Sequence, residues 1–108
     1  METVSDKNKR QNSKQILTVM VVEDNDTMRL GIRETLERDG YGVRIFADPE
    51  KAVAAFEKEP VPIVITDLKM QPLTGMDVLK YVKEREPKSE VLLISAYGTV
   101  QTAVDAMR

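Results

Sequence analysis

Apolar and polar residues form alternating blocks along the chain, and these blocks predict strands and helices in turn. Short apolar runs rich in Val, Ile and Leu occupy residues 16–22, 43–47, 63–66 and 91–94. The run at 16–22 is typical of a strand that is covered on both faces. Apolar residues recur at helical spacing after each run, in segments 28–39, 49–59, 75–86 and from 99 onward.

Turn and capping residues mark the borders of these segments. Asp48-Pro49 is typical of a helix start, Thr74 and Asp77 have the spacing of a capping box, and Gly40 follows the first helical segment. We expect these side chains to face the sheet: Met28, Ile32, Leu36, Ala52, Val53, Phe56, Val78, Leu79 and Val82. The regular alternation of strand and helix predicts an α/β domain with a doubly wound parallel sheet and helices on both faces.

Length and composition suit one small domain. The chain has 108 residues, of which 42% are hydrophobic and 31% charged. Residues 1–14 are polar and predict a flexible tail, whereas residues 15–108 carry the α/β pattern. We expect a cytoplasmic protein with no membrane contact, because no apolar stretch is long enough to span a bilayer and the start resembles no secretory signal.

Several kinds of chemistry are excluded by composition. The chain contains neither Cys nor His, which removes thiolate nucleophiles, imidazole bases and zinc sites built on these ligands. The formal net charge of −2 gives no broad basic surface for nucleic acid. No glycine-rich phosphate loop follows any of the predicted strands, which disfavours nucleotide binding.

Carboxylates follow two of the predicted strands. Glu23 and Asp24 come after the first strand and Asp67 after the third, while Ser95 follows the fourth. In open parallel sheets, ligands bind beyond the carboxyl ends of the strands. Three carboxylates in that crevice would repel one another unless one takes a proton or a cation lies among them. With oxygen ligands alone, Mg²⁺ is the natural cation, and Asp67 is then a plausible nucleophile toward a phosphoryl group.

Each of these residues also has an ordinary structural interpretation. Asp67 could be a turn residue, Glu23 and Asp24 a pair at a helix amino end, and Ser95 a strand-end hydroxyl. Lys69 could be a solvated loop lysine. The combination favours a site, because three strands end in the required residue types in the right order.

Three stretches resemble the receiver domain of two-component response regulators. These are VMVVEDND, IVITDLKMQPLTGMDVL and VLLISAYGTVQTAVDAMR, and the resemblance covers about residues 15–108. It implies flavodoxin-like receiver topology. Receivers normally continue through a fifth strand and a fifth helix, which this chain lacks. We therefore expect a piece of a longer regulator that exposes a sheet edge and part of a core face.

The resemblance also implies a role for each candidate residue. Asp67 is expected to be the phosphoacceptor and Asp24 a direct Mg²⁺ ligand, with Glu23 acting on the metal through water. Lys69 would supply a backbone carbonyl to the metal. Ser95 would be the switch hydroxyl that moves toward the phosphoryl group. The fifth strand of the family carries a further lysine and an aromatic switch residue.

The partners that the resemblance implies are a histidine kinase and an output domain. The kinase would donate from phosphohistidine, and the domain would act on no other substrate, so we do not expect an enzyme in the usual sense. The stretch SAYGTVQTAVDAM is most similar to receivers of NtrC-type sigma-54-dependent transcription activators, whose output is an AAA+ domain. The last helix is the expected surface for a homodimer.

Two other functions remain open from the sequence. A pseudo-receiver would keep the fold and bind a protein partner without phosphotransfer. A phosphohydrolase of the haloacid dehalogenase kind also uses an Asp after a strand, but it needs a second Asp two residues on, where this chain has Lys69.

Overall fold

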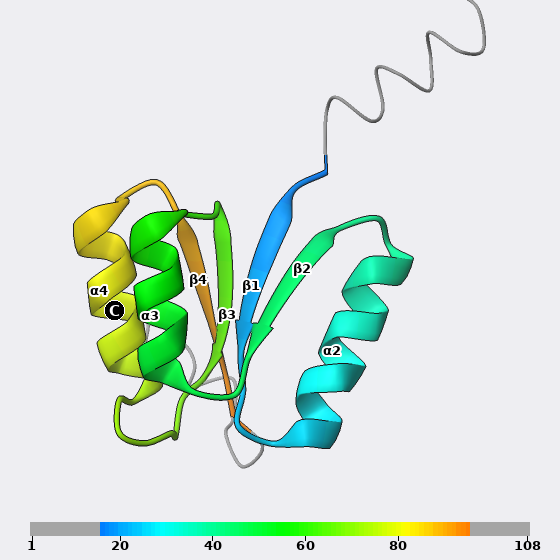
Figure 1. Cartoon of the computed structure of the whole chain (residues 1–108), viewed down its shortest axis with the longest axis horizontal. Helices are drawn as coiled ribbons and strands as arrows, with labels where there is room; N and C mark the ends of the chain where they lie inside the picture. Colours follow the sequence, from blue (N-terminus) through cyan, green and yellow to red (C-terminus); the bar gives the residue numbers. More distant parts are fainter. Residues whose placement is uncertain (1–15, 96–108) are drawn as a thin grey trace, which may run out of the picture.

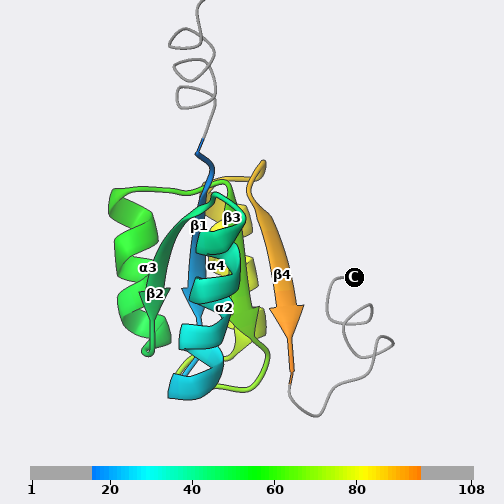
Figure 2. The ribbon, with the colours of Figure 1, turned by 90° about the vertical axis from the view of Figure 1, so that its right-hand side faces the viewer.

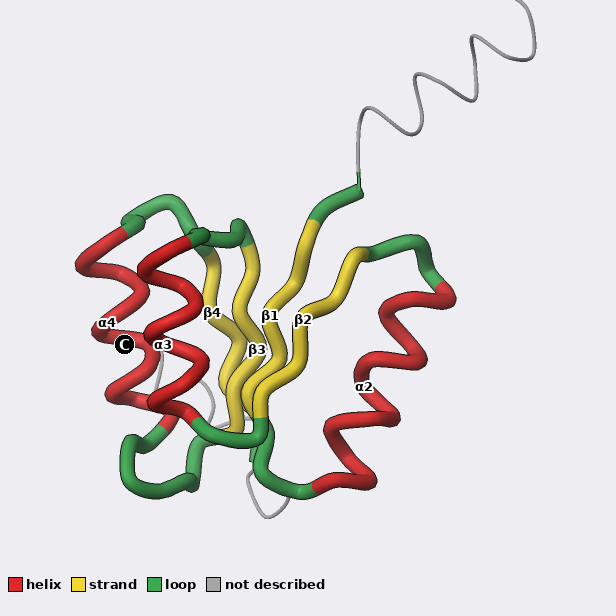
Figure 3. The backbone as a smooth tube through the Cα atoms, in the orientation of Figure 1, coloured by secondary structure: helices red, strands yellow, loops and turns green. Residues whose placement is uncertain are grey.

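The computed structural model describes residues 16–95 of the chain. Within this range, strands and helices alternate as the sequence predicts (Figure 3). The elements are β1 (Thr18–Val22), α2 (Asp26–Arg38), β2 (Gly42–Phe46), α3 (Pro49–Lys58), β3 (Ile63–Asp67), α4 (Gly75–Arg85) and β4 (Glu90–Ile94). The tail expected at 1–14 and the helix expected from Thr99 lie outside the described residues.

The strands form one parallel sheet in the order β2-β1-β3-β4. This is the strand order of flavodoxin-like domains, so the predicted fold is confirmed. Figure 1 shows α2 on one face of the sheet and α3 and α4 on the other. No helix in the range 16–95 is long and apolar enough to cross a membrane.

Local hydrogen bonds explain where the helices begin. The Met28 N–H donates to the Asn25 side chain at 2.8 Å, so α2 begins at Asp26, two residues earlier than the apolar pattern predicts. Asp48 caps α3 by accepting from the Glu50 N–H at 2.8 Å. The predicted capping box of α4 is confirmed, because Thr74 and Asp77 each accept from the other's backbone N–H.

The strands differ slightly from their predicted bounds. The first strand begins at Thr18, and Ile16 and Leu17 are 59% and 48% exposed rather than covered. The third strand continues to Asp67, which is in register with Ile94 of β4. The main chain of Asp67 is therefore part of the sheet and not of the loop that follows.

The hydrophobic core lies between the sheet and the helix pair α3 and α4. Strand residues Met20, Val22, Val64 and Val91 form its floor. The predicted inward positions Ala52, Phe56, Val78 and Val82 are buried against them, and Val53 and Leu79 are partly buried. The prediction for α2 is only partly correct, because Ile32 and Leu36 are half-buried and Met28 is exposed.

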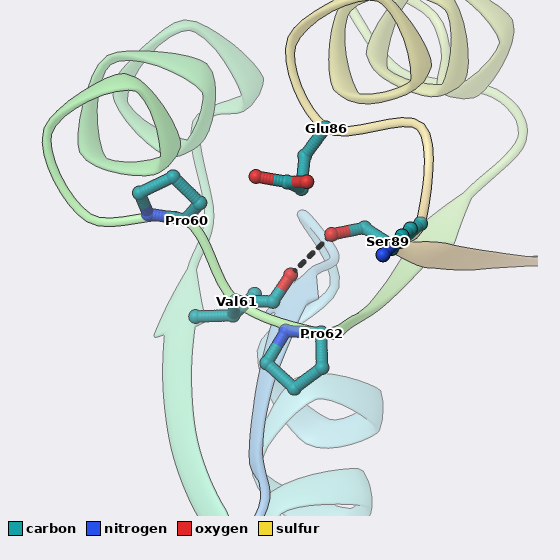
Figure 4. Close-up of a pocket in the computed structure, with 6 residues that line it drawn as sticks. Pro60, Val61, Pro62, Glu86 and Ser89 are labelled. Carbon is teal, nitrogen blue, oxygen red and sulfur yellow. Dashed lines mark hydrogen bonds between the residues drawn. The ribbon is translucent and has the colours of Figure 1, made fainter.

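Hydrogen bonds tie the amino ends of β3 and β4 together. The Ser89 hydroxyl, which is buried, donates to the Val61 carbonyl at 2.6 Å (Figure 4). The Lys83 ammonium donates to the Ser89 carbonyl at 2.5 Å, and the Glu90 N–H donates to the Pro62 carbonyl at 2.8 Å. This edge of the sheet is held by polar contacts that need no ligand.

Candidate functional site

The carboxyl edge of the sheet brings together the three acidic residues that the sequence singles out. Val22 of β1 is in register with Thr66 of β3, so the next residue of each strand reaches the same level. Glu23, Asp24 and Asp67 each offer a carboxylate oxygen, and these oxygens lie within 4.8 Å of one another. The predicted convergence of these residues is thus present in the fold.

Glu23 is the buried member of this group. Only 3% of it is exposed, and its own N–H donates to the Phe46 carbonyl at 3.0 Å. Its carboxylate accepts from the Asn25 N–H at 3.0 Å, and its carbonyl accepts from the Arg29 guanidinium at 2.9 Å. Asp24 is exposed beside it. The pair therefore offers one fixed and one solvent-accessible carboxylate.

The electrostatics of the site show that negative charge is in excess. Burial raises the pKa of the Glu23 carboxyl from 4.5 to about 7. The hydrogen bond from the Asn25 N–H opposes this shift, and the nearby charges of Asp67 and Asp24 add to it. Near neutral pH, the group therefore favours an added proton or a bound cation.

Asp67 is half-buried at the end of β3, where the chain turns sharply. The Leu68 N–H donates to the Ile94 carbonyl at 2.7 Å, which keeps β4 alongside the turn. The Lys69 N–H approaches Asp67 Oδ1 at 3.4 Å, while Lys69 itself is exposed. The role of the Lys69 carbonyl as a metal ligand stays a prediction.

Gly75 is a residue of the site that the sequence reasoning missed. A Cβ atom there would lie 2.3 Å from the Asp67 carbonyl oxygen and 2.8 Å from Leu68 Cα. The Gly75 N–H donates to the Leu68 carbonyl at 2.9 Å. Only a glycine lets the start of α4 approach the Asp67 main chain so closely. The signal in the sequence was a glycine at a helix start, where a better helix former would otherwise be expected.

Ser95 lies at the same edge of the sheet. It follows Ile94, which is in register with Asp67, and it is half-buried. This position agrees with the place expected for a switch hydroxyl. Its movement toward a phosphoryl group stays a prediction, and the residues after it lie outside the described range.

A pocket at the opposite edge of the sheet has a different character. It has a volume of about 260 Å³ and is lined by Pro60, Val61, Pro62, Glu86, Lys88 and Ser89 (Figure 4). Its buried polar side chain, Ser89, already donates to the Val61 carbonyl. The pocket is separate from the acidic residues, and its hydroxyl has a structural role.

Comparison with known proteins assigns the chain to a family. Residues 19–108 match the response regulator receiver domain. The chain belongs to this family. The receiver resemblance seen in the sequence is therefore confirmed over nearly the whole of its predicted range.

The most informative relatives of this receiver domain are larger regulators. It is 32% identical over 94 residues to an NtrX-like response regulator of Rickettsia felis, covering 85% of this chain and 20% of that protein. It is 30% identical to the alginate biosynthesis transcriptional regulatory protein AlgB of Pseudomonas aeruginosa, covering 100% of this chain and 22% of that protein. The chain thus spans about a fifth of the length of these relatives.

Solved structures show the same receiver fold. A response regulator receiver domain protein from Clostridium thermocellum aligns with a TM-score of 0.77 and 30% identity, covering 85% of this chain and 75% of that one. NtrX from Brucella abortus aligns with a TM-score of 0.79 and 29% identity, covering 87% of this chain and 22% of that one. The NtrC-type character expected from the sequence is in agreement with these matches.

Proposed function

We propose that this receiver domain accepts a phosphoryl group on Asp67 from the phosphohistidine of a histidine kinase. The observation that carries the proposal is the meeting of Asp67 with Glu23 and Asp24 at the carboxyl edge of the sheet. Asp67 is the half-buried member at a strand end, so its carboxylate is positioned by the sheet and still reaches solvent.

The donor set fits Mg²⁺. Its charged donors are the three carboxylates, and burial and mutual repulsion raise the pKa of Glu23 to about 7, so a divalent cation relieves an existing excess of charge. Asp24 and Asp67 would hold the ion directly, Glu23 would act through water and Lys69 would contribute its carbonyl. When bound, Mg²⁺ supplies positive charge that offsets the approach of an anionic phosphoryl group to an anionic nucleophile.

The transfer is a displacement at phosphorus. A carboxylate oxygen of Asp67 forms the new P–O bond while the P–N bond to the donor imidazole breaks. The imidazole leaves with the electron pair of that bond and takes up a proton. The product is a mixed anhydride on Asp67, and the kinase histidine is regenerated.

Phosphorylation would change the charge and hydrogen bonding beside β4. The added group carries further negative charge and acceptor oxygens, and the Ser95 hydroxyl is a suitable donor one residue beyond Ile94. A rearrangement of Ser95 would pass to the residues that follow it, which include the proposed dimer surface at 99–108. Because AlgB is a transcriptional regulatory protein, we propose transcription regulation in the cytoplasm through an AAA+ output domain of the sigma-54 activator kind.

The direct test is intact mass after incubation with Mg²⁺ and acetyl phosphate. We expect one added phosphoryl group on the unchanged chain and none on Asp67→Asn. Asp39→Asn, the same change at an exposed position next to α2, is the matched control and should be labelled like the unchanged chain. Equal labelling of Asp67→Asn would refute the assignment.

Two other results would indicate other functions. Mg²⁺ binding without labelling, also in a chain extended by a fifth strand and helix, would favour a binding module without phosphotransfer. Repeated turnover of a phosphate ester would favour a phosphohydrolase.

A further inference from the structure

An open groove runs between α3 and strand β2, away from the acidic edge. It has a volume of about 350 Å³ and is lined by Arg44, Lys51, Ala54, Ala55, Lys58 and Glu59. Three of these residues are basic, although the whole chain carries a net charge of −2. The groove therefore concentrates positive charge on a protein whose overall charge is negative, and it favours an anionic ligand.

The cations of the groove are available for an incoming anion. Lys51 and Lys58 are exposed, and neither makes a salt bridge or side-chain hydrogen bond within residues 16–95. The Arg44 guanidinium, which is 31% exposed, donates to the Glu59 carbonyl at 3.3 Å and lies 3.6 Å from the Glu59 carboxylate, which is 78% exposed. Exposed pairs of this kind contribute little to stability, so another carboxylate can take the place of Glu59 at small cost.

Arg44, which lines the groove, belongs to an unpaired edge strand of the sheet. Figure 2 shows β2 and β4 at the two sides of the sheet, and β2 pairs only with β1 among the described strands. The Gly42 N–H donates to the carbonyl of Leu17, the residue before β1, and the Phe46 carbonyl accepts from the N–H of Glu23, the residue after β1. Because backbone groups alternate in direction along a strand, the N–H and C=O of Val43 and Ile45 point outward from the sheet.

One more strand could be added beside β2. A strand added beside β2 would lie about 4.8 Å away and would place every second side chain on the α3 side. The small side chains of Ala54 and Ala55 leave space there, between Lys51 and Lys58 on the same stripe of α3. Lys51 and Lys58 lie roughly 10 Å apart along the helix. Carboxylates on alternate residues of the added strand would lie about 6.8 Å apart, and the long lysine side chains can span the difference.

We propose that the free edge of β2 and this groove bind an extended segment of a partner protein that carries carboxylates at alternate positions. Backbone hydrogen bonds to Val43 and Ile45 supply affinity, and Arg44, Lys51 and Lys58 supply selectivity for acidic side chains. The proposal uses no residue of the acidic site and does not depend on phosphorylation of Asp67.

Fluorescence anisotropy with a short labelled peptide, in which glutamate and valine alternate, tests the proposal on the full chain. We expect saturable binding, and a loss of affinity of about tenfold or more in Lys51→Glu/Lys58→Glu. The double variant Lys80→Glu/Lys88→Glu makes the same charge change at exposed positions outside the groove and should bind like the unchanged chain. The affinity of Lys51→Gln/Lys58→Gln for the peptide should lie between those of the two charge-reversal variants.

Three controls separate strand addition from general attraction between charges. A peptide of the same composition with its glutamates contiguous, and one with its backbone nitrogens methylated, should both bind several-fold more weakly. Hydrogen exchange at the Val43 and Ile45 amides should slow on binding. The proposal would be overturned by equal binding of all peptides, by equal binding of both charge-reversal variants, or by unchanged exchange at these amides. The role left for the lysines would be to prevent aggregation through the sheet edge.

Discussion

The two faces of the sheet are covered to very different degrees. On the face toward α3 and α4, strand and helix side chains interlock, and Phe56 and Val64 are fully buried. On the other face, within residues 16–95, Val19 and Val21 of β1 are buried, but α2 contributes no buried residue and Leu92 of β4 is 51% exposed. Both faces carry apolar strand residues, so within residues 16–95 the difference lies in the helices that cover them.

This difference indicates how the acidic site is supported. The helix pair is joined across its surface, because Glu57 of α3 accepts from both the Tyr81 hydroxyl and the Arg85 guanidinium of α4. Gly75 then brings the start of α4 against the Asp67 main chain. The closed face therefore anchors Asp67, whereas α2 anchors Glu23 through Arg29. The site is held from both sides of the sheet, but more firmly from one.

Truncation of Phe56 should have the largest effect on stability and tests whether the two faces contribute unequally. Phe56→Ala should lower the free energy of unfolding by about 3–5 kcal/mol, because it leaves a cavity in the closed face. Leu30→Ala removes apolar surface from α2, where Leu30 is 44% exposed, and should cost less than about 1 kcal/mol. Urea denaturation of both variants measures these values. Equal losses would show that the two faces contribute alike.

A neutral residue in place of Glu23 measures how the charge of the site affects the free energy of unfolding, apart from the packing of the two faces. The pKa of Glu23 in the folded chain, about 7, lies above its ordinary value of 4.5, so the folded chain binds this proton more tightly. That stabilisation is complete below about pH 4.5 and is lost as the pH rises through about 7. Without divalent cation, Glu23→Gln should therefore raise stability by about 3 kcal/mol at about pH 8 and change it little at about pH 4.

Denaturation of this variant over a range of pH, with and without Mg²⁺, is the measurement. Glu37→Gln makes the same change at an exposed position of α2 and should have little effect at any pH. Added Mg²⁺ should stabilise the unchanged chain more than the variant and so reduce the difference. A variant that is less stable at high pH would contradict the excess of negative charge at the site.

A substitution at Gly75 tests whether the packing of α4 against β3 positions Asp67. Gly75→Ala should cost about 1–3 kcal/mol and slow phosphorylation of Asp67, because the new Cβ atom collides with the Asp67 carbonyl. Gly31→Ala is the matched change in α2, where a Cβ would meet nothing within 4 Å. That substitution should stabilise the chain by about 0.5–1 kcal/mol through helix propensity. Rates of acetyl phosphate labelling and urea midpoints compare the two variants.

The smallest effect is expected on the open face. Leu92→Thr should change stability by no more than about 0.5 kcal/mol, since the side chain is half exposed and threonine suits a strand. A loss of several kcal/mol in urea denaturation would mean that a cover for this face forms in solution.

Much of the fold could be predicted because it depends on local pattern. The apolar runs, the caps at Asp48 and Thr74 and the turn at Gly40 each have a local physical cause, and Gly40 does adopt a positive φ of 94°. The convergence of Glu23 and Asp67 follows because the carboxyl ends of parallel strands meet at one edge of the sheet. These predictions required no knowledge of packing.

The features that were missed depend on distances between segments. The sequence predicts that part of a core face is exposed, but only the fold shows that Leu92 lies there. The close approach of Gly75 to Asp67 depends on where α4 meets the sheet. The sequence does not say which of Glu23 and Asp24 is buried, and only the fold shows that Glu23 is buried and Asp24 exposed.

The bond from the Ser89 hydroxyl to Val61 has a consequence for local motion. It ties β3 to β4 at the edge farthest from the acidic residues, where the link is buried and carries no charge to be neutralised. Backbone amides near it should exchange with solvent only when the whole domain unfolds, whereas those at the carboxyl edge should also exchange through smaller local openings. The end of the sheet that carries the acidic residues is then free to change its arrangement while the other end keeps the strands in register.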